Sequence, residues 1–188
     1  MSWFLSLTLA ATLAGAPDGA PAGNSKTPLV IKPATPSDVA ASLLAADSRR
    51  IRATTARIGT LINDGVQRSR TFANLVAEVH KTNVIVYVQS SMALPPDVAG
   101  RILFAGAAGN QRYLRVQISA SLTRDQMIAV IAHELRHALE VAAEHSVVNE
   151  KALEAFYRRI GDSPHIGGGY DTEAARLAQR IVRQELNG

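Results

Sequence analysis

Ala132-His133-Glu134-Leu135-Arg136-His137-Ala138-Leu139 is the stretch that decides how the rest of the chain is interpreted. Its pattern is H-E-x-x-H. Two residues four positions apart lie on the same face of an α-helix, so the rings of His133 and His137 can converge on one metal ion. Glu134 then stands beside the metal, where a general base can take a proton from a metal-bound water molecule.

The flanking residues predict a long amphipathic helix. Thr123 and Gln126 have the spacing of a capping box, and Leu122 and Met127 have that of a hydrophobic staple. One apolar stripe follows at helical spacing: Ile128, Ile131, Leu135, Leu139 and Ala142. At about 100° per residue the two histidines fall roughly opposite that stripe. We therefore expect the helix to bury one face in a core and to offer the histidine face to a cleft.

The motif in this helix resembles the active helix of the zincin metallopeptidases. Arg136 departs from the family pattern, which usually has uncharged residues between the histidines. The resemblance implies that His133 and His137 bind Zn²⁺ and that Glu134 acts as the general base in peptide-bond hydrolysis. The alternative interpretation is a surface helix with two ordinary histidines.

The composition narrows the classes of function and of metal site. The chain has 188 residues, enough for one domain with a sizeable core, and a formal charge of +4. Its basic residues are scattered, so no nucleic-acid partner is predicted. The absence of cysteine excludes disulfides, thiolate zinc sites and cysteine nucleophiles. A metal must therefore bind nitrogen and oxygen ligands, which suits a catalytic zinc site.

The N-terminal residues predict export. Residues 1–16 contain a short apolar run followed by small residues, as in a secretory signal peptide, and the run is too short to span a membrane. Residues 17–36 are rich in Pro, Ala and Gly and predict a linker. The metallopeptidase-like domain would then occupy residues 37–188, with Ser37 as a helix N-cap, in a periplasmic or secreted protein. The alternative for the leader is a disordered, Ala-rich tail.

The expected fold class is α+β, with a sheet of three or more strands packed against the motif helix. Further helices are expected before and after it. Two helices are expected before the sheet, over residues 37–65, ending at Gly65, and over residues 70–81. The expected strands cover residues 84–88, 101–107 and 113–118. Two later helices are expected, from Asn149 to about residue 160 and from Thr172 to about residue 186.

The resemblance also implies a role for one strand of the sheet. In zincins the strand nearest the cleft pairs with an extended substrate, because adding a peptide to a sheet edge holds it straight. The hairpin around Gly109 supplies the best candidates for that edge. The alternative is an ordinary core hairpin.

A catalytic zinc ion needs a third protein ligand. The metzincin pattern would place a histidine at position 143, which is Ala143, and His145 lies on a different helical face. Carboxylates remain, which makes the site gluzincin-like or aspzincin-like. The candidates, in order, are Asp171, Glu173 and Glu154, whereas Glu140 and Glu144 are expected to support the ligands or to form salt bridges.

A second resemblance favours Asp171. From about Ile51 to the C-terminus the chain is similar to a group of uncharacterised exported bacterial proteins with an H-E-L-x-H-A-L-E core and an aromatic–acid–Thr group before the last helix. Asp171 corresponds to the acid of that group, where glutamate is common, and Tyr170 to the aromatic residue. Tyr170 is then the candidate donor to a reaction oxyanion, with His165 as the alternative. An acid at a helix start also serves as an ordinary N-cap.

Three functional hypotheses follow. The first is an exported zinc metallopeptidase acting on a peptide or protein substrate. The second is a non-catalytic binding module on the same scaffold in the cell envelope. The third is a structural domain in which the motif is accidental. Substrate specificity and oligomeric state are not predicted.

Overall fold

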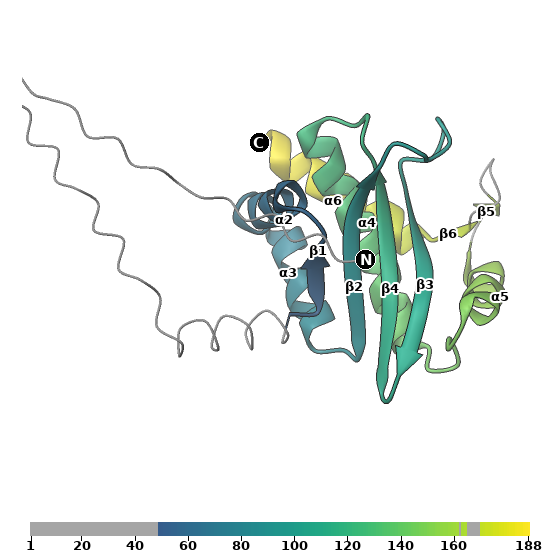
Figure 1. The fold of residues 1–188 in the computed structure, drawn as a ribbon. Helices are drawn as coiled ribbons and strands as arrows, with labels where there is room; N and C mark the ends of the chain where they lie inside the picture. The colour runs from purple at the N-terminus through teal and green to yellow at the C-terminus, as the bar shows by residue number, and fades with distance from the viewer. Residues whose placement is uncertain (1–48, 162, 165–169) are drawn as a thin grey trace, which may run out of the picture. The chain divides into compact units, whose positions relative to one another are not determined.

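The computed structural model describes residues 49–161, 163–164 and 170–188 (Figure 1). The elements are β1 (Ile51–Ala53), α2 (Ala56–Arg68), α3 (Arg70–His80), β2 (Val84–Ser91), β3 (Gly100–Ala108), β4 (Gln111–Ser119), α4 (Arg124–Ala143), α5 (Glu150–Ile160), β5 (Ser163–Pro164), β6 (Tyr170–Asp171) and α6 (Glu173–Asn187). The predicted signal peptide, linker and Ser37 cap lie outside these residues. None of the described helices has the length and apolar character needed to cross a bilayer.

The fold class is α+β, as predicted. A mixed sheet has the strand order β1-β2-β4-β3, in which β1, β2 and β4 run parallel and β3 runs antiparallel to β4. The predicted hairpin is the β3–β4 pair, and Gly109 at its turn has a φ of 57°, a left-handed conformation that glycine adopts without strain. β3 is therefore an edge strand of the four-stranded sheet.

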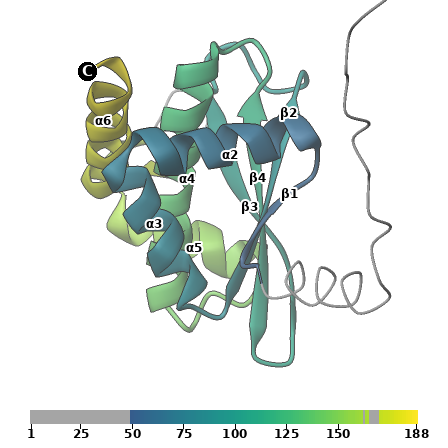
Figure 2. The ribbon, with the colours of Figure 1, turned by 90° about the vertical axis from the view of Figure 1, so that its left-hand side faces the viewer.

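The motif helix α4 lies between the sheet and α6 (Figure 2). β2 is buried from Val84 to Val86, and in β4 buried and more exposed positions alternate. α4 is also capped as predicted: the Thr123 side chain accepts a hydrogen bond from the Gln126 N–H, and the Gln126 side chain accepts one from the Thr123 N–H. This capping fixes where the motif helix begins.

The first predicted helix was partly wrong. Ile51–Ala53 is a strand, because its backbone pairs in parallel with Val86–Val88, and tertiary pairing overrides the helical pattern of apolar residues. α2 begins only after its N-cap Thr55 and continues through Gly65 to Arg68. Gly65 does not end the helix. A Cβ there would lie 2.8 Å from a ring carbon of Phe72, so the glycine permits close packing of α3.

The prediction that the histidine face of α4 is open to a cleft was also wrong in part. Glu134 and His137 are each only 4% exposed. Gly100 at the start of β3 approaches the Glu134 carboxylate, whereas Tyr157 of α5 and Asp171 of β6 contact His137. The motif thus lies inside the domain, between the sheet on one side and the C-terminal elements on the other.

Glu185 fastens α6 to the start of α3. Its carboxylate accepts hydrogen bonds from the Ser69 hydroxyl, from the Thr71 N–H at 3.1 Å and from the Thr71 hydroxyl at 2.9 Å. Partial burial opposes ionisation, but these hydrogen bonds outweigh it and lower the pKa of the Glu185 carboxyl. α6 covers α4, so this anchor also holds the cover of the motif in place.

Replacing Glu185 by glutamine should lower the free energy of unfolding at pH 7 by about 1 kcal/mol, a modest value because solvent screens the partly exposed carboxylate. Since folding lowers the pKa of Glu185, its contribution is complete above the ordinary value of 4.5 and is lost as the pH falls through the lower folded value. Urea denaturation at pH 7 and pH 3 measures both effects. The exposed Glu154→Gln variant is the control, and an equal Glu185→Gln effect at both pH values would contradict this account.

Candidate metal centre

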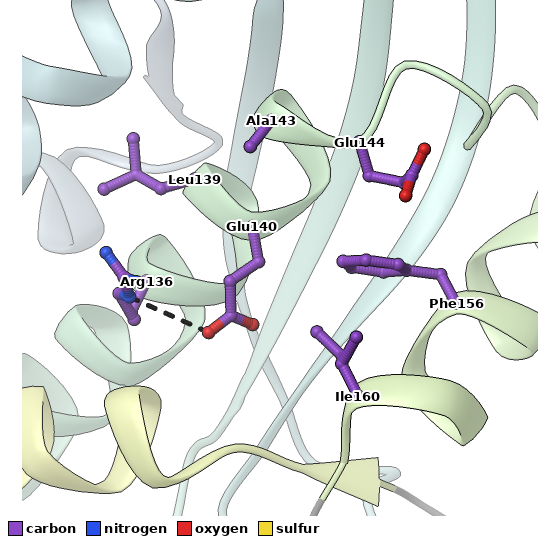
Figure 3. Close-up of a pocket in the computed structure, with 7 residues that line it drawn as sticks. All are labelled: Arg136, Leu139, Glu140, Ala143, Glu144, Phe156 and Ile160. Carbon is purple, nitrogen blue, oxygen red and sulfur yellow. Dashed lines mark ion pairs between the residues drawn. The ribbon is translucent and has the colours of Figure 1, made fainter.

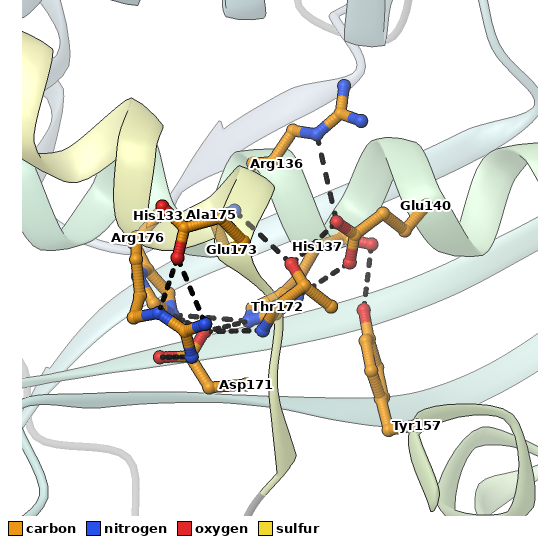
Figure 4. Close-up of polar contacts among 10 residues, drawn as sticks. All are labelled: His133, Arg136, His137, Glu140, Tyr157, Asp171, Thr172, Glu173, Ala175 and Arg176. Carbon is orange, nitrogen blue, oxygen red and sulfur yellow. Dashed lines mark hydrogen bonds and ion pairs between the residues drawn. The ribbon is translucent and has the colours of Figure 1, made fainter. Parts of the chain in front are cut away.

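Three side chains from two distant segments form a cluster that can hold a metal ion (Figure 4). His133 and His137 come from adjacent turns of α4, and Asp171 comes from β6. The Nε2 atoms of the two histidines are 3.1 Å apart, and Asp171 Oδ1 lies 3.2 Å from His133 Nε2 and 3.6 Å from His137 Nε2. The structure thus brings together the two motif histidines and the carboxylate ranked first from the sequence.

The spacing of these atoms is compatible with three ligands of one metal ion. Ligand atoms about 2.0–2.2 Å from a tetrahedral ion such as zinc lie about 3.3–3.6 Å apart. Two of the observed separations, 3.1 and 3.2 Å, are slightly shorter than that range, and the third, 3.6 Å, lies at its upper end. Two imidazoles and one carboxylate are a donor set that divalent transition metals bind.

The other predicted candidates do not join the cluster. Glu154 forms an exposed ion pair with Arg158, and Glu173 forms one with Arg180 at 2.7 Å. His145 is exposed. Tyr170 lies in β6 directly before Asp171, but its side chain, like all of His165, lies outside the described part of the structure.

Glu134 is buried against the first residue of the edge strand. A Cβ built on Gly100 would lie 2.8 Å from Glu134 Oε1 and 2.6 Å from Val130 Cγ1, so only glycine leaves room for the carboxylate there. Burial raises the pKa of the Glu134 carboxyl, while the charges of His133 and His137 oppose the rise. A carboxyl with a raised pKa accepts a proton more readily, as a general base must.

His137 is held from several sides. Its Nδ1 atom is 2.8 Å from Glu140 Oε2, and Tyr157 donates a hydrogen bond to its backbone oxygen at 3.0 Å. The Tyr157 ring also meets the imidazole edge-on at 4.9 Å. Burial lowers the pKa of His137, but hydrogen bonds to Asp171 and Glu140 outweigh it and raise the pKa to about 9. Tyr157 is a residue of this site that the sequence analysis did not identify.

The His133 ring has fewer hydrogen-bond partners than the His137 ring. Among the described residues its Nδ1 atom is buried without a hydrogen-bond partner. A metal-binding histidine usually donates its second ring N–H to a carboxylate, a carbonyl or water, which fixes the tautomer. Of the two imidazoles, His137 is therefore the one that the described protein groups orient.

The edge strand β3 passes beside Glu134. Ala99 O accepts a hydrogen bond from Ser119 N in β4, so alternate residues from Gly100 onward turn their backbone groups away from β4. One such group is already bound: the Phe104 N–H donates to Glu150 Oε2 at 2.7 Å. The stretch open to an added strand is therefore Gly100–Leu103, next to the general-base candidate.

A cavity of about 360 Å³ adjoins the cluster on the α5 side (Figure 3). The apolar residues that line it are Leu139, Ala143, Phe156 and Ile160, and the charged ones are Arg136, Glu140 and Glu144. Glu140 projects between Arg136 and the α5 side chains in Figure 3, and its carboxylate also contacts the candidate ligand His137. Glu140 thus links the cavity wall to the candidate metal cluster.

Searches of protein-family models, of curated proteins and of solved structures find no match to this chain.

Removing one ligand should remove the metal. We expect His137→Ala and Asp171→Asn to lower zinc affinity by more than the roughly 10–100-fold that loss of a supporting residue costs. Elemental analysis of protein purified without a histidine tag measures the zinc content. His145→Ala is the matched control and should keep the wild-type content. Unchanged zinc in His137→Ala would show that the cluster is not the metal site.

Proposed function

We propose that the protein is a zinc-dependent metallohydrolase that cleaves peptide bonds. One observation carries the proposal: two imidazole nitrogens and a carboxylate oxygen meet at zinc-ligand spacing, with the Glu134 carboxyl at the next position of the same helix. A zinc ion bound there would act as a Lewis acid and lower the pKa of a water molecule.

The residues of the chain have separate tasks in this proposal. His133, His137 and Asp171 hold the ion. Glu134 takes the proton from the attacking water and then delivers it to the leaving amine, as a carboxyl of raised pKa can. Tyr170, next to Asp171 in the chain, would donate a hydrogen bond to the developing oxyanion.

An extended peptide is the substrate that suits the neighbouring sheet edge. The outward backbone groups of Gly100 and Ile102 can pair with an added strand, which would pass beside Glu134. Glu150 occupies the next position by binding the Phe104 N–H. The paired stretch of substrate would therefore be short. The proposal includes export from the cell, on the ground of the N-terminal sequence.

A non-catalytic binding module is the second candidate function. The observation that favours it is the burial of the motif, since Glu134 and His137 are each only 4% exposed. In that case a partner would bind along the edge strand, and the ion would only stabilise the domain.

The two functions differ in what Glu134 does. Glu134→Gln should reduce hydrolysis of a quenched peptide library by at least about 100-fold, because general-base catalysis contributes that much, and should leave the zinc content unchanged. Glu154→Gln, on the exposed face of α5, is the control. Full activity in Glu134→Gln would overturn the proposed mechanism. Wild-type protein that binds zinc but shows no chelator-sensitive hydrolysis would favour the binding module.

The close approach of Gly100 to Glu134 gives a second test. Gly100→Ala should displace the Glu134 carboxylate, because the new methyl group would lie 2.8 Å from Oε1. We expect a loss of stability of about 1–3 kcal/mol and a fall in hydrolysis with zinc retained. Gly59→Ala is the matched control, since its methyl group would meet only Ala53 Cβ at 3.7 Å. Wild-type hydrolysis by Gly100→Ala would contradict the placement of the base.

A further inference from the structure

We propose that Glu140 and Thr172 are positioning residues that preform the metal site by joining its two halves. Their hydrogen bond, here called the Glu140–Thr172 bridge, fixes the His137 ring on α4 against the segment that carries Asp171. The inference rests on the metal site proposed above. It adds two residues that would not touch the ion.

The Glu140 carboxylate uses one oxygen for each half of the site (Figure 4). Glu140 Oε2 lies 2.8 Å from His137 Nδ1, one helical turn away. Glu140 Oε1 accepts a hydrogen bond from the Thr172 hydroxyl at 2.8 Å. With Nδ1 donating to Glu140, the Nε2 atom of His137 is the one left to face the cluster, which is the tautomer that a metal ligand needs.

Thr172 links this carboxylate to the third ligand. Its hydroxyl donates to Glu140 and accepts from the Ala175 N–H at 3.2 Å, and so it caps α6 at the same time. Its own N–H donates to Asp171 Oδ1, the cluster atom, at 2.7 Å. Thr172 thus holds the Asp171 carboxylate directly and ties its segment to α4 through Glu140.

Hydrogen bonding, rather than packing, holds Glu140 in place. The side chain of Glu140 is only 9% exposed, yet it borders the cavity on the α5 side, where no close-packed layer confines the carboxylate. Arg136 Nε lies 3.7 Å from Glu140 Oε1, beyond hydrogen-bond distance. Removing the Thr172 hydroxyl would leave Glu140 with its His137 contact and the Arg136 ion pair, and would break its tie to the segment that carries Asp171.

The Glu140–Thr172 bridge is important because, among the described residues, no comparable carboxylate binds the Nδ1 atom of His133. Among the residues that the structure describes, His133 Nδ1 has no hydrogen-bond partner. Glu140 therefore orients the better-held imidazole, and Thr172 holds both Glu140 and the carboxylate ligand. Two of the three candidate ligands thus depend on the same pair of residues.

The test is the zinc dissociation constant of the full chain, measured with zinc alone by competition with a chromophoric chelator. Thr172→Val and Glu140→Ala should each weaken zinc binding roughly 10–100-fold, as loss of residues that support a metal ligand does. Thr172→Ser keeps the hydroxyl and should bind zinc as the wild type does. The double variant should bind no more weakly than the weaker single variant, because both substitutions break one bridge.

One control and one further use of the Glu140→Ala variant separate positioning from simple stability. Thr55→Val removes the corresponding N-cap of α2, where the Thr55 side chain accepts from the Ile58 N–H, and should lower stability without changing zinc affinity. Glu140→Ala removes no cap, so it carries the test if Thr172→Val does not fold. Wild-type zinc affinity in Glu140→Ala or in folded Thr172→Val, or additive losses in the double variant, would overturn the bridge alone. Absence of zinc binding by the wild type would overturn the proposed function, and the bridge with it.

Discussion

The structure depends on how it stabilises an acid and an imidazole inside an otherwise apolar core. Glu134 and His137 are buried on a helix whose neighbouring turns pack against the sheet. An isolated charge there would cost several kcal/mol, so each group needs partners within hydrogen-bonding reach. For His137, the Glu140 carboxylate lies at hydrogen-bond distance and the Asp171 carboxylate lies 3.6 Å away. The C-terminal elements therefore complete the site as well as cover the helix, and this is why the polar cluster and the fold are inseparable.

Local sequence signals predicted much of the fold because local interactions decide those features. Examples are the capping box at Thr123, the turn at Gly109 and the helix starts near Asn149 and Thr172. Each depends on residues only a few positions apart. The shared face of His133 and His137 follows from helical spacing alone. The preference for Asp171 over Glu173 came from a resemblance, and the geometry agrees with it: of these two acids, only Asp171 belongs to the cluster.

The features that sequence did not predict are long-range. β1 forms only because Ile51–Ala53 finds Val86–Val88 as a parallel partner. The sequence around Gly100 does not predict its role, because that role depends on how β3 packs against α4. In the structure, the missing side chain of Gly100 leaves room for Glu134. Thr172 can cap α6 whichever residue its hydroxyl faces across the domain. The sequence therefore does not predict its hydrogen bond to Glu140, 32 positions away. In each case the sequence shows which type of residue is present, but tertiary packing decides which partner that residue contacts.

The central claim is that His133, His137 and Asp171 bind one zinc ion together. X-ray absorption spectroscopy at the zinc edge, on tag-free wild-type protein and on Asp171→Asn, tests it most directly. The account predicts a wild-type spectrum with two imidazole ligands and oxygen ligands at about 2.0–2.2 Å, and a changed coordination shell in Asp171→Asn. A wild-type spectrum without imidazole scattering, or one that Asp171→Asn leaves unaltered, would contradict it.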